Sequence, residues 1–301
     1  MKTYGYYPGC SLEKMAASYH VSTLASAQAL GVELKELEDW NCCGSTAYFH
    51  VDELLANTLC ARNLAIAERA GLDLVIPCSG CYKNMFYAKE HLANDPDLAE
   101  HINYALEADN LVFRGQVEVL HALDLFANEV GLEEIKKKVK RPLKGLRVAP
   151  YYGCQILRPR KEPATIGDVE GPRFFEDLLA AIGATPVSFP RKLSCCGASL
   201  IITNRKAALA MIHDVLQSAV DQQTEILATA CPLCQVNLEC YQQQVNQEFG
   251  TRLSLPILFF TQLLGLALGI PEKDVGIGSE FVSAQPALDK VWAQELAPVT
   301  S

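Results

Sequence analysis

Short runs of apolar residues alternate along the chain with longer segments whose apolar residues recur at helical spacing. The runs at 2–10, 72–81 and 225–234 have the length and the β-branched and aromatic residues of buried strands. Segments 52–71 and 204–220 instead place apolar residues three or four positions apart, as amphipathic helices do. Strands that alternate with helices predict an α/β fold with parallel sheets built from βαβ units.

One segment is apolar enough to be compared with a membrane span. Residues 253–270 form an 18-residue apolar stretch, which is near the lower limit for crossing a bilayer. The stretch contains Pro256, Thr261 and Gln262, and the corresponding segment 117–131 is not membrane-like. The pattern therefore predicts a buried strand that runs into a core helix.

The chain contains an internal repeat, which its cysteines mark most clearly. The first half has Cys10, Cys42-Cys43 and Cys78-x-x-Cys81, and the second has Cys154, Cys195-Cys196 and Cys231-x-x-Cys234. In both halves 34 residues separate the adjacent pair from the CxxC motif, and from the pair onward the halves are offset by 153 positions. The repeat predicts two similar domains, 1–140 and 141–270, followed by a C-terminal extension at 271–301.

Every cysteine of the repeat follows a predicted strand. Ligands of open parallel sheets bind in the crevice outside the carboxyl ends of the strands, which lie along one edge. We therefore expect two similar domains, each a small parallel sheet flanked by helices, with five sulfurs gathered at the strand ends. The cysteine-bearing edges of the two sheets should face one another.

Composition narrows the class of protein. A chain of 301 residues can bury two cores, and a formal net charge of −9 argues against nucleic acid as a partner. The amino-terminal residues lack a cationic region followed by an apolar one, so we expect no secretory signal and a cytoplasmic protein. Twelve cysteines in a reducing compartment favour metal binding or redox chemistry over structural disulfides.

The adjacent cysteines limit what the five sulfurs could bind. A disulfide between neighbouring residues is strained, because adjacent Cα atoms lie closer than a relaxed bridge requires. Structural zinc takes four ligands, and a conventional cubane cluster uses a dense run of cysteines that this chain lacks. Five thiolates that include an adjacent pair favour a larger or distorted iron–sulfur cluster, with Gly44 and Gly197 allowing a tight turn. Zinc in one half remains the alternative.

The duplicated motif resembles the CCG domain. The openings YYPGCSLE at 6–13 and VAPYYGCQILRP at 148–159, with two such domains filling nearly the whole chain, resemble the heterodisulfide reductase B-subunit family. The resemblance implies one non-cubane [4Fe-4S] cluster in each half and an enzyme that cleaves a disulfide between the two clusters. The implied ligands are Cys10, Cys42, Cys43, Cys78 and Cys81 in one half, and Cys154, Cys195, Cys196, Cys231 and Cys234 in the other.

The resemblance also implies partners. The chain has no dinucleotide fingerprint and no ferredoxin-type run of cysteines, so its electrons must come from elsewhere. In the family the donors are a ferredoxin-like C subunit and a flavin-containing A subunit, and membrane contact is at most peripheral. One alternative is a CCG subunit that exchanges electrons with a quinone in an atypical succinate dehydrogenase-like complex, which predicts an exposed amphipathic helix. Another is a non-catalytic assembly subunit whose clusters or zinc are structural.

Several residues outside the repeat are weaker candidates. Cys60 and Cys240 have no cysteine counterpart in the other half, so we expect them to be structural thiols. His50 and His121 are the candidate proton donors. The cations that could recognise an anionic thiol substrate are Arg158, Arg160, Lys161 and Lys192.

Overall fold

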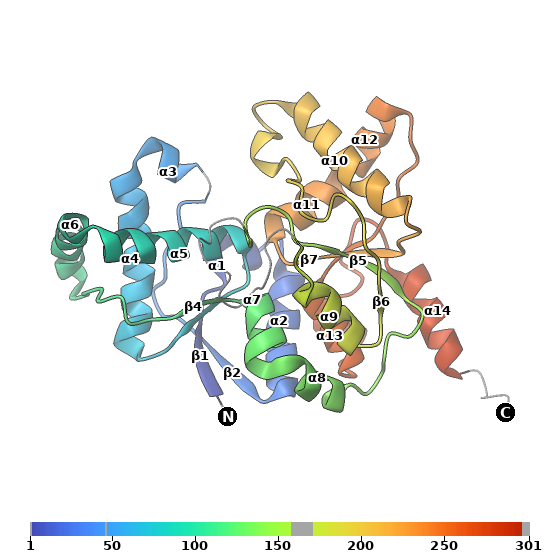
Figure 1. The fold of residues 1–301 in the computed structure, drawn as a ribbon, viewed down its shortest axis with the longest axis horizontal. Coiled ribbons are helices and arrows are strands. Elements are labelled where there is room, and N and C mark those ends of the chain that lie inside the picture. Colours follow the sequence, from blue (N-terminus) through green and yellow to red (C-terminus); the bar gives the residue numbers. More distant parts are fainter. Residues whose placement is uncertain (1, 46, 158–170, 297–301) are drawn as a thin grey trace.

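The computed structural model describes residues 2–45, 47–157 and 171–296. It contains two four-stranded parallel sheets, one in each half of the chain (Figure 1). The first has the order β2-β1-β3-β4 and the second the order β6-β5-β7-β8. The strands are β1 (Lys2–Tyr6), β2 (Val32–Glu36), β3 (Leu74–Ile76), β4 (Val119–His121), β5 (Arg147–Tyr151), β6 (Thr185–Pro186), β7 (Ile226–Thr229) and β8 (Ile257–Phe259). The α/β fold with two similar sheets is the one predicted.

Helices connect the strands of the first sheet and flank it. They are α1 (Gly9–Leu12), α2 (Ala17–Leu30), α3 (Tyr48–Val51), α4 (Glu53–Ala70), α5 (Ser79–Asn94), α6 (Pro96–Leu106), η1 (Glu107–Asp109), α7 (Ala122–Asp124), the π-helical η2 (Leu125–Gly131) and α8 (Leu132–Lys138). The helix predicted over 52–71 is α4. Its bounds have local causes, because the Asp52 side chain accepts a hydrogen bond from the Leu55 amide and Gly71 ends the helix in the left-handed conformation.

The second sheet is flanked in a similar way. Its helices are α9 (Phe174–Ala181), η3 (Ala198–Leu200), α10 (Arg205–Val220), α11 (Pro232–Cys240), α12 (Gln242–Phe249) and α13 (Phe260–Ala267). The C-terminal residues add η4 (Glu272–Val275) and α14 (Gln285–Leu296). The helix predicted over 204–220 is α10, and the Asn204 side chain caps its first turn by accepting from the Ala207 amide.

One hydrophobic cluster contains residues of both halves, and each half has a further cluster of its own. Helix α2 of the first half packs against α13 of the second, and the two lie side by side in Figure 1. At this contact the ring of Tyr19 stacks on Phe259, with 4.2 Å between centroids and 6° between planes, and both rings are buried. The Ser22 and Thr261 hydroxyls hydrogen-bond across the same contact at 2.6 Å. Because aromatic side chains dominate the energy of such contacts, this packing fixes the halves relative to one another.

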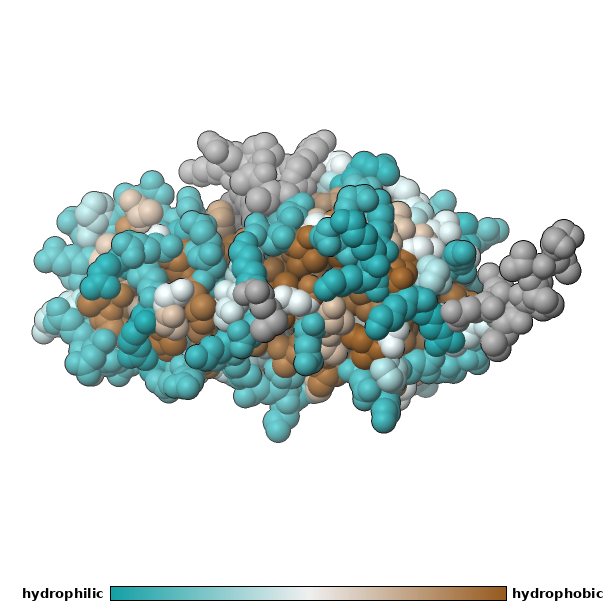
Figure 2. Space-filling model, turned by 90° about the horizontal axis from the view of Figure 1, so that it is seen from below, coloured by the Kyte–Doolittle hydropathy of each residue, from teal (hydrophilic) through white to brown (hydrophobic). Residues whose placement is uncertain are grey.

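The apolar segment 253–270 lies inside the protein, as predicted. Strand β8 and helix α13 are buried along their whole length. Over the described residues, no helix is long and apolar enough to cross a membrane. Seen from below, hydrophilic residues cover much of the surface and hydrophobic ones appear in patches between them (Figure 2), which is ordinary for a folded protein.

Candidate functional site

The five cysteines of the first repeat line one small cavity. Each follows a strand of the first sheet: Cys10 lies in α1, Cys42 and Cys43 in the loop after β2, and Cys78 and Cys81 at the start of α5. The cavity has a volume of about 30 Å³, and its other lining residues are Ser11, Ser45, Gly80 and Leu233. Parallel pairing brings these strand ends to one edge of the sheet, which explains why residues 71 positions apart share a wall.

The second repeat brings its five sulfurs together in the same way. Cys43 Sγ lies 3.2 Å from Cys81 Sγ, and the corresponding Cys196 Sγ lies 3.5 Å from Cys234 Sγ. Side-chain hydrogen bonds join the remaining members in the order Cys154, Cys195, Cys196, Cys234 and Cys231. Each half therefore forms one continuous group of five sulfurs.

The two groups touch at the boundary between the halves. The side chains of Cys78 and Cys231 hydrogen-bond to each other, and each residue directly precedes a helix. Beside this contact Ser79 Oγ donates to the carbonyl oxygen of Ala230 at 2.9 Å. The cysteine-bearing edges of the sheets therefore face one another.

Crowding and burial make the thiols strongly interdependent. The hydrogen bond with Cys231 is the largest cause of a raised pKa at Cys78, and the hydrogen bond with Cys43 has the same effect at Cys81. Cys43 and Cys231 accept hydrogen bonds from neighbouring thiols, which lower the pKa of each. In a buried group, several thiolates can coexist only when positive charge balances them. The site therefore favours a bound metal group.

The chemistry of the donors agrees with this requirement. Only cysteine sulfurs and small polar or apolar groups line the first cavity, and thiolates are soft ligands that suit iron–sulfur clusters and zinc. Among the described residues, no three His, Cys, Asp or Glu side chains are grouped so that they could hold a single metal ion. The sulfurs surround a shared space, so the residues present fit a multinuclear cluster.

Two glycines that the sequence analysis did not single out keep the sulfurs accessible. Gly9 and Gly153 precede the first cysteine of each half and have φ of +69° and +66°. A Cβ atom at Gly9 would lie 3.3 Å from Cys81 Sγ, and one at Gly153 would lie 3.3 Å from Cys234 Sγ. A side chain would therefore be strained at either position and would crowd a candidate ligand. The signal in the sequence was a glycine before the first cysteine in both halves.

Two asparagines hold the adjacent-cysteine loops in place and were also missed. Asn84 Nδ2 donates to the carbonyl oxygen of Cys43 at 3.2 Å, and Asn237 Nδ2 donates to that of Cys196 at 2.6 Å. Both asparagines are buried and come three residues after a CxxC motif. They are related by the same offset of 153 positions, so the repeat could have identified them.

A pair of tyrosines also supports these loops. Tyr7 donates its hydroxyl proton to the Asn41 carbonyl oxygen at 2.9 Å, and Tyr151 donates to that of Ser194 at 2.6 Å. Burial raises the pKa of both phenols, so each remains a donor. Because the acceptors directly precede the adjacent cysteines, the tyrosines position the start of each loop.

Cys60 and Cys240 lie outside the two sulfur groups. Cys60 is fully buried, and its Sγ donates to the Cys43 carbonyl oxygen at 3.5 Å. Burial raises the pKa of Cys60, so the residue remains a thiol. Cys240 is half-buried and lines a separate, larger cavity. Neither residue lines the cavity that the candidate ligands of the first half surround.

The two candidate histidines occupy different environments. His121 is buried, its Nδ1 accepts from the Leu123 amide at 3.0 Å, and its Nε2 lies 3.2 Å from Ser79 Oγ. His50 is exposed in α3 and lies near Phe49 in a separate pocket, away from the cavity that the cysteines line. Only His121 therefore reaches the boundary between the sulfur groups, through Ser79.

The candidate substrate-binding cations are mostly outside the described residues. Arg158, Arg160 and Lys161 fall in that undescribed part of the chain. Lys192 is described, and its Nζ donates to Glu176 at 2.6 Å and to the Pro172 carbonyl oxygen at 3.0 Å. Lys192 already forms an ion pair with the buried carboxylate of Glu176, so its charge mainly stabilises the fold.

Comparison with known proteins agrees with this architecture. The family model of the CCG cysteine-rich domain matches residues 4–86 and 148–239, which contain both sulfur groups. The chain is 36% identical to the 8-methylmenaquinol:fumarate reductase membrane anchor subunit of Wolinella succinogenes, over 94% of this chain and 98% of that protein. It is 32% identical to the B-subunit of the ferredoxin/F420H2-dependent CoB-CoM heterodisulfide reductase of Methanosarcina acetivorans, over 95% and 96%.

A solved structure shows the same fold. A hypothetical protein from Helicobacter pylori superimposes with a TM-score of 0.75 at 17% identity, over 94% of this chain. This chain spans about half of that one, 52% of its length. With the family match covering more than half of the sequence, the chain belongs to the CCG cysteine-rich domain family, in the two-domain form that it shares with the heterodisulfide reductase B-subunit.

Proposed function

We propose that the chain is the iron–sulfur subunit of a heterodisulfide reductase-like complex and reduces a disulfide to two thiols between two non-cubane [4Fe-4S] clusters. Five cysteines in each half would hold one cluster. The proposed ligands are Cys10, Cys42, Cys43, Cys78 and Cys81 for the first, and Cys154, Cys195, Cys196, Cys231 and Cys234 for the second. The relatives named as reductase subunits support electron transfer within a complex.

The contact between Cys78 and Cys231 carries the proposal. Reducing a disulfide takes two electrons and gives two thiolates, and two one-electron redox groups at the same bond can supply both electrons. When bound, the clusters would supply those electrons and iron positions with affinity for sulfur. The two loops that meet at this contact would present both groups to the same small space.

The remaining residues of the boundary would handle protons and orientation. Because His121 Nδ1 accepts a hydrogen bond, its neutral ring carries the proton on Nε2, which faces Ser79 Oγ. Ser79 in turn donates to the Ala230 carbonyl, next to Cys231. We infer that His121 is the candidate proton donor at this boundary, with Ser79 linking its ring to the loop of Cys231, and that the exposed His50 has no part in the reaction.

The partners and place of action follow from the same proposal. Beyond the two sulfur groups, the described residues hold no further group of cysteines, so electrons would come from a ferredoxin-like C subunit and a flavin-containing A subunit. The protein would act in the cytoplasm, with membrane contact only at the periphery. The division into domains 1–140, 141–270 and an extension at 271–301 is part of this proposal.

Metal analysis and spectroscopy test the proposal together. Protein purified without oxygen should contain about eight irons and matching acid-labile sulfide per chain, from two four-iron clusters. Its EPR signal should change when a thiol substrate is added, because substrate sulfur would bind at a cluster. Four irons with one zinc would show that one half is structural and would exclude cleavage between two clusters.

A second function has a specific observation in its favour. A relative that is 36% identical over nearly its whole length is named as a subunit of an 8-methylmenaquinol:fumarate reductase. We therefore also propose, as the alternative, a CCG subunit that exchanges electrons with a quinone. The two functions share the clusters and differ in the small molecule that meets them.

A further inference from the structure

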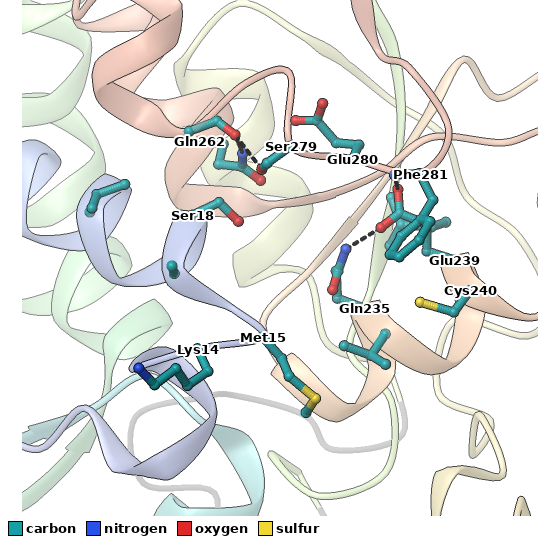
Figure 3. Close-up of a pocket in the computed structure, with 15 residues that line it drawn as sticks. Lys14, Met15, Ser18, Gln235, Glu239, Cys240, Gln262, Ser279, Glu280 and Phe281 are labelled. Atoms are coloured by element: carbon teal, nitrogen blue, oxygen red, sulfur yellow. Dashed lines mark hydrogen bonds between the residues drawn. The ribbon is translucent and has the colours of Figure 1, made fainter.

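A cavity of about 590 Å³ lies beside the sulfur groups but outside them. Its walls come from both halves and from the C-terminal extension, and Figure 3 shows the side chains that line it. Helix α11 carries Cys234 in its first turn and contributes Gln235 and Glu239 to the wall. Glu239 lies five residues beyond Cys234, which is about 7.5 Å along the helix. One wall of the cavity is therefore built on the helix that carries Cys234.

Another part of the wall is connected along the chain to the first sulfur group. Lys14 and Met15 line the cavity and follow α1, the short helix that contains Cys10. Helices α1 and α11 contact each other across the boundary between the halves. One ligand in this cavity would thus border helices that carry candidate cluster ligands from both halves.

The lining residues suit a ligand that has a ring with polar substituents and an apolar tail. Most of the wall is apolar, and Met15 and Phe281 leave 62% and 79% of their surface exposed beside the space. The lining also contains the buried carboxylate of Glu239. Glu239 accepts hydrogen bonds from the Phe281 amide at 3.1 Å and from Gln235, as Figure 3 shows.

Charge within the cavity favours a neutral, proton-exchanging ligand. Burial raises the pKa of Glu239 to about 7, and the nearby carboxylate of Glu280 adds to the rise. Lys14 is the cation among the lining residues, and the half-buried Cys240 is a thiol. A carboxyl group that titrates near neutral pH can accept and release a proton with little driving force.

From this geometry we propose that the cavity between α2, α11 and residues 276–281 binds the ring of a quinone or quinol, with Glu239 as its proton acceptor. The inference rests on the alternative, quinone-linked function. In the direction of quinol oxidation the ring loses two electrons and two protons. The two electrons would go to the clusters that the ten cysteines would hold, one proton would pass to Glu239, and the other proton would pass to water.

Binding of menadione, a short naphthoquinone, tests the site directly. Ala17 is exposed at the cavity wall and Ala29 is exposed on the same helix, about 18 Å away and outside the lining. Ala17→Trp should weaken the calorimetric affinity for menadione at least tenfold, whereas the matched Ala29→Trp should leave it unchanged. Equal affinity in the wild type and Ala17→Trp, or no binding by protein that holds both clusters, would overturn the proposal.

A second variant separates proton transfer from binding. Glu239→Gln should keep the affinity for menadione but slow the single-turnover reduction of the clusters by menadiol roughly 100-fold. An unchanged rate would remove Glu239 from the reaction. The iron content and the EPR spectrum of every variant test the proposed function separately from the quinone site. Protein without clusters would contradict the proposed function, whereas menadione binding alone decides whether the cavity is a quinone site.

Discussion

Cys78 and Cys231 hydrogen-bond to each other although they belong to different halves of the chain. Each residue lies two positions after the end of a strand, β3 or β7, and directly precedes a helix, α5 or α11. Stacking of Tyr19 on Phe259 holds the halves together behind them. The contact is therefore fixed by the core of the protein and does not depend on a flexible surface loop.

The division of the twelve cysteines gives the first prediction. Cys43→Ser should lose about four of the eight irons, because a proposed ligand is removed. Cys60→Ser changes an equally buried thiol that donates to the Cys43 carbonyl oxygen and does not line the cysteine cavity, so its iron content should stay at the wild-type level. Iron and acid-labile sulfide per chain measure both variants. Equal loss of iron from the two would contradict the division.

The glycine before each first cysteine gives a second prediction. In Gly9→Ala the left-handed backbone costs about 1–2 kcal/mol, and the new methyl group also presses on Cys81 Sγ. Gly71→Ala is the matched control, since its φ is +67° and no atom lies within 4 Å of the added Cβ. Both variants should lower the melting temperature, but only Gly9→Ala should also release iron. Iron retained in Gly9→Ala would show that the close approach is unimportant.

The asparagines behind the adjacent cysteines give a third prediction. Asn84→Ala removes the donor to the Cys43 and Ser45 carbonyl oxygens, which should cost about 1–3 kcal/mol in unfolding free energy. Asn237→Ala should have a similar effect in the other half. Thermal melting and the rate of iron release to a chelator measure the change. A variant that melts and releases iron like the wild type would refute the positioning role.

The sequence predicted the two sheets and the grouping of the sulfurs because both depend on local patterns. Strand-like runs, helical spacing and the constant offset are all visible without tertiary contacts. The sequence did not predict Asn84 or Tyr7, because neither shows its hydrogen-bond partner until distant loops come together. The sequence also left Lys192 as a candidate cation for substrate binding, because its ion pair with the buried Glu176 forms only in the folded protein.

The two candidate histidines show the same limit. His50 and His121 have comparable positions near strand or motif ends in the sequence. Burial separates them, because His121 closes β4 inside the core and His50 lies exposed on α3. Only the three-dimensional arrangement brings Ser79 between His121 and the second half of the chain.

The asymmetry between the halves gives a fourth prediction. His121 ends β4, and the corresponding last residue of β8 is Phe259. His121→Phe would make the halves alike and remove the donor to Ser79. Disulfide reduction should slow, and its dependence on pH should change, while iron content stays at the wild-type level. A rate and pH profile like those of the wild type would exclude His121 from proton transfer.

The buried carboxyl group of Glu239 gives the last prediction, which concerns stability. Burial raises its pKa from 4.5 to about 7, so the folded state holds a proton that the unfolded chain has already released. The stabilisation associated with that proton is complete below pH 4.5 and is lost as the pH rises through 7. The total is at most about 3 kcal/mol.

Glu239→Gln removes this dependence on pH while keeping an acceptor oxygen for the Phe281 amide. The melting temperature of the variant minus that of the wild type should therefore rise between pH 5 and pH 8, by about 2–4 °C for each kcal/mol. A difference that stays constant over this range would mean that the carboxyl group does not titrate between these pH values. Its proton could then not be exchanged with a ligand near neutral pH, and the cavity would need another acceptor.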